Sequence, residues 1–311
     1  MQPFFSIIIP TLNEEQCLPR LLEDLQNQNI RNFEVIVVDG GSSDMTITIP
    51  SHFPQLKIRC YKIKKSNVSI QRNFGAGKSQ GKYLVFLDAD SQIIRGFCKN
   101  LQHTIKMKPS LVYIPKILPE DKNIHSRLIF ELVNIIIELS QLMPRPFSSG
   151  GNMIWEKNFF SLVGGFDEKL FLAEDHNIIG KAVSWGVHAR YLDGIKIVFS
   201  LRRIEKEGNL RLYYKYIIAT AYMVLKKKID KKIFDYPMGG AGYSLSKSKK
   251  KKKYHLIDQL RSYLKQAERL IVDDVSKKIN RINQHFYLNI SLIIFFFVKN
   301  WDNCRDFHFY N

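Results

Sequence analysis

A run of apolar residues that ends in two aspartates constrains the fold of this chain more than any other feature. Residues 83–87 are apolar or aromatic throughout, which is typical of a strand buried on both faces of a parallel sheet. Asp88 and Asp90 follow where that strand must end. Because ligands of open α/β sheets bind beyond the carboxyl ends of the strands, we expect chemistry at these carboxylates. Taken alone, the motif is more typical of an Asp-rich turn in solvent, because turns are rich in aspartate.

The two aspartates also have the spacing and chemistry of a divalent-cation site. Alternate residues of an extended segment point the same way, so Asp88 and Asp90 can face one ligand across the small Ala89. Carboxylate oxygens suit Mg²⁺ or Mn²⁺, which proteins commonly hold with one or two carboxylates and the phosphates of a substrate. The motif therefore predicts Mn²⁺ or Mg²⁺ as the cofactor.

Strand and helix patterns alternate through the first two thirds of the chain. Apolar runs predict strands at residues 4–9, 33–38, 56–61, 83–87, 111–116, 152–155 and 187–192. Apolar spacing and capping residues predict helices over residues 18–25 and 69–79, the second capped by Ser69, and a further helix that opens at Glu174. This alternation predicts an α/β fold with a doubly wound, mostly parallel sheet that carries helices on both faces.

One predicted helix, over residues 126–143, is apolar on most of its surface. Its polar positions Glu131, Asn134, Glu138 and Gln141 lie on one stripe. An apolar face this broad either packs into the core or lies against another apolar surface. Because the polar stripe is acidic, unlike that of a typical membrane-surface helix, the core interpretation is favoured.

The charge of the chain is strongly basic. Its 311 residues contain 47 Lys and Arg against 29 Asp and Glu, a formal net charge of +18. A surplus of this size indicates an anionic partner, such as nucleic acid, a phosphorylated substrate or acidic lipid. The four cysteines are widely separated and form no Cys-x-x-Cys pair, so we expect reduced thiols in the cytoplasm, without a zinc site.

The pattern changes after residue 200, where the strand signals cease. We expect a catalytic domain over residues 1–208 and a helical, Lys-rich extension over residues 209–311, with a helix at 213–228. The extension carries a run of five lysines at 249–253, and its longest apolar run, at 287–298, is too short to span a bilayer. Peripheral association with the inner face of a membrane is the favoured interpretation of the basic run, over a nucleic-acid patch or solubility alone.

Polar groups gather after several of the predicted strands, and together they form an ordered set of motifs. The motifs are Ile-Ile-Ile-Pro-Thr-Leu-Asn-Glu at 7–14, Val-Ile-Val-Val-Asp-Gly-Gly-Ser at 35–42, Arg-Asn-Phe-Gly-Ala at 72–76, Phe-Leu-Asp-Ala-Asp at 86–90, and Gly-Gly-Phe-Asp at 164–167 before Glu174-Asp175. In this order they resemble the family-2 glycosyltransferases of the GT-A fold, over residues 4–208. The resemblance implies transfer of a sugar, with inversion, from a UDP- or GDP-sugar to a hydroxyl or lipid-phosphate acceptor.

The resemblance also implies a role for each matching position. Contacts to the nucleotide fall to Pro10, Thr11, Asn13, Glu14, Asp39, Arg72, Asp88, Arg202 and Arg203. Asp90, with Asp88 beside it, would bind the metal, and Asp175, with Glu174 beside it, would be the catalytic base. Gly150, Gly151 and Asn152 would form the sugar and acceptor pocket. No histidine lies near residues 200–208, where some members place a further metal ligand, so the third protein ligand is unassigned.

Structural alternatives stay open for several of these positions. Asn13 has the residue type of a helix N-cap, and Asp39 that of an Asx-turn cap. The carboxylates Glu174 and Asp175 at a helix N-terminus also complement the helix dipole. Arg72 and Arg202 could be solvated surface charges.

Two other functions compete with sugar transfer. A nucleotidyltransferase that forms a nucleotide sugar would have a related sheet, but residues 10–14 lack the Gly-rich phosphate loop with its lysine. A non-catalytic nucleic-acid-binding protein would explain the charge, but the lysine run has no interleaved aromatic residues for base stacking. The expected partners are therefore a nucleotide-sugar donor, a sugar or lipid-linked acceptor and an anionic membrane surface, without nucleic acid.

Overall fold

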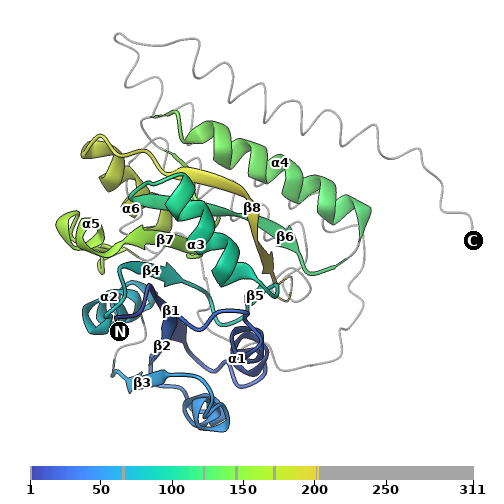
Figure 1. The fold of residues 1–311 in the computed structure, drawn as a ribbon, viewed down its shortest axis with the longest axis vertical. Coiled ribbons are helices and arrows are strands. Elements are labelled where there is room, and N and C mark those ends of the chain that lie inside the picture. Colours follow the sequence, from blue (N-terminus) through green and yellow to red (C-terminus); the bar gives the residue numbers. More distant parts are fainter. Residues whose placement is uncertain are drawn as a thin grey trace, which may run out of the picture. The chain divides into compact units, whose positions relative to one another are not determined.

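The computed structural model describes residues 2–64, 67–121, 123–143, 146–170, 173–200 and 202. Eight strands form one sheet in the order β3-β2-β1-β4-β7-β6-β8-β5 (Figure 1). The strands are β1 (Phe5–Thr11), β2 (Phe33–Asp39), β3 (Ile58–Lys62), β4 (Tyr83–Phe86), β5 (Gln92–Ile93), β6 (Val112–Pro119), β7 (Met153–Glu156) and β8 (Arg190–Phe199). The helices are α1 (Leu18–Gln26), the 3₁₀ helix η1 (Met45–His52), α2 (Val68–Lys78), α3 (Phe97–Met107), α4 (Ile124–Ser140), α5 (Lys157–Leu162) and α6 (Glu174–Ser184).

The predicted α/β fold with a mostly parallel, doubly wound sheet is confirmed. Strands β3, β2, β1 and β4 are parallel neighbours, and β6 is parallel to β8. The antiparallel strand β7 lies between β4 and β6, and the short β5 pairs antiparallel with β8. The seven predicted strands correspond to β1–β4 and β6–β8, although β8 begins three residues later than predicted and continues to Phe199.

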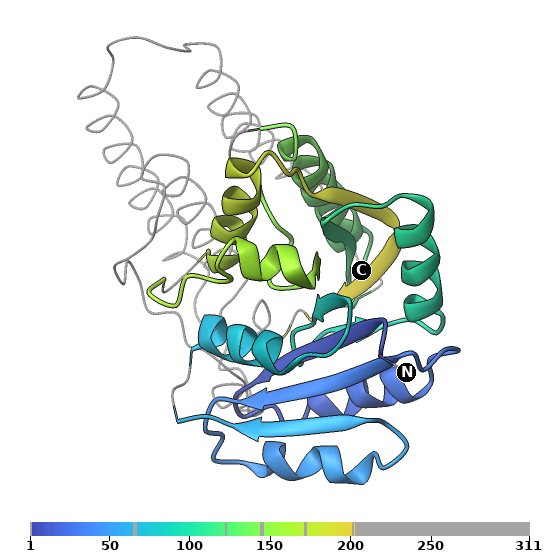
Figure 2. The ribbon, with the colours of Figure 1, turned by 60° about the vertical axis from the view of Figure 1, so that its left-hand side comes forward.

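The sheet is buried on both faces, as the apolar runs predicted. Ile7 and Ile9 of β1 pack into one core cluster with α1, η1 and α3, whereas Ile8 between them packs into a second cluster with α2, α4, α5 and α6. Figure 2 shows α2 on one face of β1–β3 and α1 with η1 on the other. Because successive side chains of a strand point to opposite faces, a continuous apolar run is what such a sheet requires.

Several local predictions differ from the structure. Helix α2 is capped by Asn67, whose side chain accepts a hydrogen bond from the Ile70 backbone N–H at 3.0 Å, and not by Ser69, which lies inside the helix. Asn67 has the extended backbone of an N-cap, a position that asparagine favours. The elements η1, β5, α3 and α5 were not predicted.

Helix α4 is oriented differently from the favoured core interpretation of residues 126–143. Its polar residues Asn134 and Gln141 are buried, while Leu128 and Leu139 are about 60% exposed, at 61% and 58%. The prediction that the apolar face packs into the core holds for Ile137, which lies in the second core cluster, and is wrong for Leu128 and Leu139. Within the part of the chain that the structure describes, no helix is long and apolar enough to cross a membrane. Arg203, the predicted boundary at residue 208 and the lysine run at 249–253 lie outside the described residues.

Candidate active site

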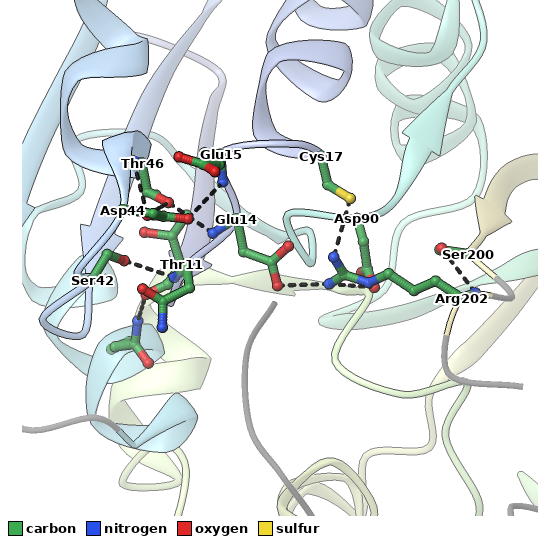
Figure 3. Close-up of polar contacts among 12 residues, drawn as sticks. Thr11, Glu14, Glu15, Cys17, Ser42, Asp44, Thr46, Asp90, Ser200 and Arg202 are labelled. Atoms are coloured by element: carbon green, nitrogen blue, oxygen red, sulfur yellow. Dashed lines mark hydrogen bonds and ion pairs between the residues drawn. The ribbon is translucent and has the colours of Figure 1, made fainter. Parts of the chain in front are cut away.

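The loops that follow β1 and β2 are bonded to each other at the carboxyl ends of these strands (Figure 3). The Asn13 side chain accepts hydrogen bonds from the Ser43 backbone N–H at 2.8 Å and from the Ser43 hydroxyl at 3.1 Å. The backbone N–H of Asn13 donates to the Ser42 hydroxyl, and that of Glu14 donates to the Thr46 hydroxyl at 2.7 Å. Asn13 has a positive φ of 54°, which asparagine tolerates better than most residues. Its role in this structure is to join two loops.

Asp39 is the centre of the second loop. Its carboxylate accepts hydrogen bonds from the backbone N–H groups of Gly41 and Ser42, at 3.0 and 2.9 Å, and from the hydroxyls of Ser42 and Thr11. The residue is 0% exposed. These bonds are those of the turn cap that the sequence left open as an alternative to a nucleotide contact. Pro10 and Thr11 lie directly before the loop, at the buried end of β1.

A guanidinium group lies between two carboxylates on the far side of the first loop. Arg202 Nη2 is 2.6 Å from Glu14 Oε1 and 3.0 Å from Asp90 Oδ2, and Arg202 Nη1 donates to Cys17 Sγ at 3.1 Å. Figure 3 shows Arg202 reaching across from beyond β8 to meet Glu14 and Asp90. Burial raises the pKa of the Cys17 thiol, and the nearby Arg202 charge opposes that rise. A residue from the end of the described chain thus contacts the first loop and the Asp-Ala-Asp motif together.

A second guanidinium joins the Asp-Ala-Asp motif to helix α6. Arg72 of α2 is 2% exposed. Its Nη2 donates to Asp88 Oδ1 at 2.7 Å, and its Nη1 donates to Glu174 Oε1 at 2.9 Å. The guanidinium also lies over the Phe166 ring, 5.2 Å from its centroid, in a cation–π contact. One buried side chain therefore holds the end of β4 beside the start of α6, although these segments are far apart in the sequence.

The loop before β7 is shaped around this arginine. A Cβ atom on Gly151 would lie 1.6 Å from Arg72 Nη2, so any side chain there would force Arg72 to move. Asn152 is 0% exposed, and its Oδ1 accepts hydrogen bonds from the Asp88 backbone N–H and the Ser91 hydroxyl, both at 3.0 Å. Gly150 has a φ of +88°, which favours glycine. Gly151 and Asn152 therefore support the positions of Arg72 and Asp88 from below the surface.

Helix α6 begins with the two predicted catalytic carboxylates. Burial raises the pKa of Glu174, the Arg72 charge lowers it, and the neighbouring Asp175 raises it further. His176 Nδ1 accepts a hydrogen bond from the Ser148 backbone N–H at 2.9 Å and lies 3.8 Å from Asp175 Oδ2. Because Nδ1 is an acceptor there, neutral His176 carries its proton on Nε2. The histidine fixes the loop before β7 against α6.

The carboxylates at the end of β4 fit a divalent ion whose coordination a substrate completes. The described residues contain no group of three or more His, Cys, Asp or Glu side chains placed to hold a metal by themselves. Asp90, however, already faces a cationic group, the Arg202 guanidinium. One or two carboxylates together with phosphate oxygens are a common donor set for Mg²⁺ and Mn²⁺.

Two residues that the sequence analysis did not single out help to build this site. Gln71 is buried, and its Nε2 donates to the backbone carbonyls of Thr11 and Val38 at 2.7 and 2.8 Å. It ties together the ends of β1 and β2 from beside Arg72. His176 follows Glu174-Asp175 directly, but a lone histidine on a helix gives no spacing signal, so only the tertiary contacts reveal its role.

The fold and the convergence of these loops define a GT-A-type α/β protein. Residues 6–164 match the model of the family described as glycosyl transferase family 2, and the chain belongs to that family. In fold, the chain is similar to S. aureus TarS 1–349 in complex with UDP-GlcNAc, with a TM-score of 0.54, 22% identity, and coverage of 64% of this chain and 58% of that chain. It is also similar to the mannosyltransferase PcManGT from Pyrobaculum calidifontis, solved with GDP-Man and Mn²⁺, with a TM-score of 0.58, 20% identity, and coverage of 73% and 63%.

Curated relatives match a shorter region. An uncharacterized glycosyltransferase of Haemophilus influenzae is 36% identical over 110 residues, which are 35% of this chain and 37% of the relative. A PGL/p-HBAD biosynthesis glycosyltransferase of Mycobacterium bovis is 38% identical over 94 residues, which are 29% of this chain and 37% of the relative. The match thus spans little more than a third of the length of each of these relatives, so it carries the family and not the substrate.

Proposed function

We propose that this protein is an inverting, metal-dependent glycosyltransferase that moves a sugar from a UDP- or GDP-sugar to a hydroxyl or lipid-phosphate acceptor. The observation that carries the proposal is the pair of hydrogen bonds from Arg72 to Asp88 and Glu174, at 2.7 and 2.9 Å. Direct displacement needs one group of carboxylates near the leaving diphosphate and another near the incoming alcohol. Arg72 contacts one member of each proposed group, Asp88 and Glu174, which supports this proposal.

Asp175 is the base in this proposal. With inversion, a carboxylate must take the proton of the acceptor hydroxyl on the side opposite the leaving group. Glu174 is held by Arg72, so it acts as a positioning residue that fixes the first turn of α6. Gly150, Gly151 and Asn152 are the proposed sugar and acceptor pocket, in which Gly151 makes room for Arg72 and Asn152 stabilises the loop from within.

Asp90 and Asp88 are the proposed metal-binding residues. When bound there, Mn²⁺ or Mg²⁺ would offset the negative charge of the leaving diphosphate. Arg202 contacts Asp90 now, and a guanidinium in that position can also bind phosphate oxygens in two-point contacts. Arg202 therefore exchanges a carboxylate partner for a phosphate partner when the donor binds.

The linked loops after β1 and β2 are the proposed nucleotide site. Pro10 and Thr11 come from the end of β1, Asn13 and Glu14 come from the loop after it, and Asp39 organises the second loop. The structural neighbours were solved with UDP-GlcNAc or with GDP-Man and Mn²⁺, which supports a nucleotide diphosphate donor and a divalent ion. Family membership favours sugar transfer over the formation of a nucleotide sugar.

The test uses the full chain with Mn²⁺ and a panel of UDP- and GDP-sugars. We expect slow release of UDP or GDP from one donor, and NMR of the first product formed should show the inverted anomer. Asp175→Asn and Asp90→Asn should each lower this rate at least a hundredfold, whereas Asp193→Asn, at a surface carboxylate whose side chain is 75% exposed, should not change it.

Three results would contradict the proposal. The first is a full rate in Asp90→Asn with chelator present, and the second is retention of the anomeric configuration. The third is release of pyrophosphate from a nucleoside triphosphate and a sugar phosphate, which would instead identify a nucleotidyltransferase.

A further inference from the structure

Asn73 of α2 is joined to a distant loop by two hydrogen bonds to one backbone residue. Its Nδ2 donates to the Phe166 carbonyl and its Oδ1 accepts from the Phe166 N–H, both at 2.9 Å. Nδ2 also donates to the Glu168 carboxylate at 3.0 Å. An amide side chain carries the same donor and acceptor as a peptide group, so Asn73 pairs with Phe166 as a residue of a neighbouring strand would.

The loop that carries Phe166 lies directly against Asn73. A Cβ atom on Gly165 would be 2.7 Å from Asn73 Oδ1, and Gly165 has a positive φ of 61°, which favours glycine. The same loop is also held from α6, where Lys181 Nζ donates to the Gly165 carbonyl at 2.6 Å. Loss of the Asn73 side chain would therefore shift the loop, while Lys181 keeps it attached to α6.

The Phe166 ring links this loop to the candidate active site. The residue is 2% exposed, and the Arg72 guanidinium lies 5.2 Å from the ring centroid. The ring also packs in a T-shaped arrangement against Phe86 of β4, with 5.3 Å between the centroids. Phe86 comes two residues before Asp88. One ring therefore contacts both the arginine and the strand that leads to a carboxylate the arginine binds.

Packing against Phe166 limits where the Arg72 guanidinium can lie. The side chains of its two partners, Asp88 and Glu174, are 28% and 15% exposed, so each carboxylate can follow a displaced guanidinium. The buried Nε of Arg72 makes no hydrogen bond within the described ranges. The aromatic contact, together with the close backbone of Gly151, therefore holds the guanidinium in place, as packed neighbours do for the side chains of a functional site.

We propose that Asn73 is a positioning residue of the active site, which fixes Arg72 through the Phe166 ring. The inference deepens the proposed function and rests on it. Arg72 and Asn73 are adjacent on α2, about 100° apart around the helix axis, so one helix supplies the guanidinium and also holds the ring that packs against it. While Asn73 holds Phe166, the carboxylates Asp88 and Glu174 keep the spacing that Arg72 sets. Without that hold, both carboxylates move with the guanidinium.

The kinetic test is a double-mutant cycle in the full chain, with Mn²⁺ and the donor that the wild type hydrolyses. Asn73→Ala and Phe166→Leu should each lower kcat about tenfold, with little change in KM for the donor, because small misplacements at a reacting centre slow turnover. Since both act through one contact, the double variant should be no slower than the slower single variant, whereas independent effects would multiply to about a hundredfold. The control Glu168→Ala removes the other partner of Asn73 Nδ2 and should leave kcat unchanged.

A second measurement does not depend on activity. In protein labelled with ¹⁵N-arginine, the Arg72 Nε–H signal, identified by its loss in Arg72→Met, is shifted by the ring current of Phe166. In Asn73→Ala it should move toward its position in Phe166→Leu, and in Glu168→Ala it should stay in place. An unmoved signal in Asn73→Ala, or multiplied losses of kcat in the double variant, would overturn the inference. A wild type that hydrolyses no donor would instead refute the proposed function, and the Arg72 signal distinguishes the two failures.

Discussion

Replacing Arg72 by methionine tests the architecture of the site most directly. The guanidinium is 2% exposed and is the group that bridges Asp88 and Glu174. Methionine keeps much of the side-chain volume but removes the charge and both hydrogen bonds. The two carboxylates would then face each other without the cation between them.

The expected loss of stability follows from the burial of the three groups. Removing one partner of a buried ion pair costs about 3–5 kcal/mol. The side chains of Asp88 and Glu174 are 28% and 15% exposed, so water can solvate them in part and the lower end applies, about 3 kcal/mol. For a domain of this size, each kcal/mol shifts the Tm by roughly 2–4 °C. We therefore expect the Tm of Arg72→Met to fall by roughly 6–12 °C.

The activity of Arg72→Met should also fall, because the loss of the guanidinium misplaces two groups of carboxylates at once. A displacement of about 1 Å can cost a hundredfold in rate, so kcat for donor hydrolysis should drop by about that factor below the unfolding temperature.

Arg59→Met is the matched control. Arg59 pairs with buried Glu34 at 2.6 Å, but Glu34 keeps hydrogen bonds from Ser6 and Gln80, and the pair lies away from the site. The control should lose some stability and no activity. A Tm within about 2 °C of the wild type for Arg72→Met, on the same scale, would refute this account.

Three further perturbations test other parts of the site. Gly151→Ala should lower the Tm by several degrees and reduce activity, because the new Cβ would collide with Arg72. The control Gly180→Ala, where nothing lies within 4 Å of the new Cβ, should stabilise the protein by about 0.5–1 kcal/mol. Thermal unfolding compares the two variants, and equal losses of Tm would contradict the close approach of Arg72 to Gly151. Arg202→Gln should bind Mn²⁺ about tenfold more tightly in the absence of nucleotide, since the charged hydrogen bond to Asp90 that it removes is worth about 1.5–3 kcal/mol. An electron paramagnetic resonance titration measures this affinity, and the variant should also raise KM for the donor. Weaker Mn²⁺ binding would disprove a competition between Arg202 and the metal for Asp90. Because the pKa of Glu174 is raised above its usual 4.5, the folded state binds that proton more tightly than the unfolded state and loses stability as pH rises from about 4.5 through the raised pKa. The Tm of Glu174→Gln should therefore decline less between pH 4.5 and 7 than that of the wild type. The same dependence of Tm on pH in both proteins would refute the raised pKa of Glu174.

The sequence predicted the sheet well because burial on two faces leaves a clear signal. Glu34 is the one polar residue in the runs at residues 33–38 and 83–87, and the structure buries alternate apolar residues of each run in two different cores. Strand β8 was predicted less well. Arg190, Asp193 and Lys196 interrupt its apolar pattern, because the structure leaves Arg190 and Asp193 exposed and Lys196 only partly buried.

By itself the sequence determined the fold class, the family and the segments that carry polar groups at the strand ends, because these depend on local pattern and order along the chain. Only the tertiary structure decided how those groups are paired. Arg72 and Glu174 are 102 positions apart, and Arg202 and Glu14 are 188 apart, so no local spacing links them. Tertiary contacts also determine the orientation of α4, with its leucines facing outward. The apolar pattern of the helix predicted burial, but Asn134 is buried and hydrogen-bonded to β6, because a buried backbone group without a partner costs more than an exposed leucine.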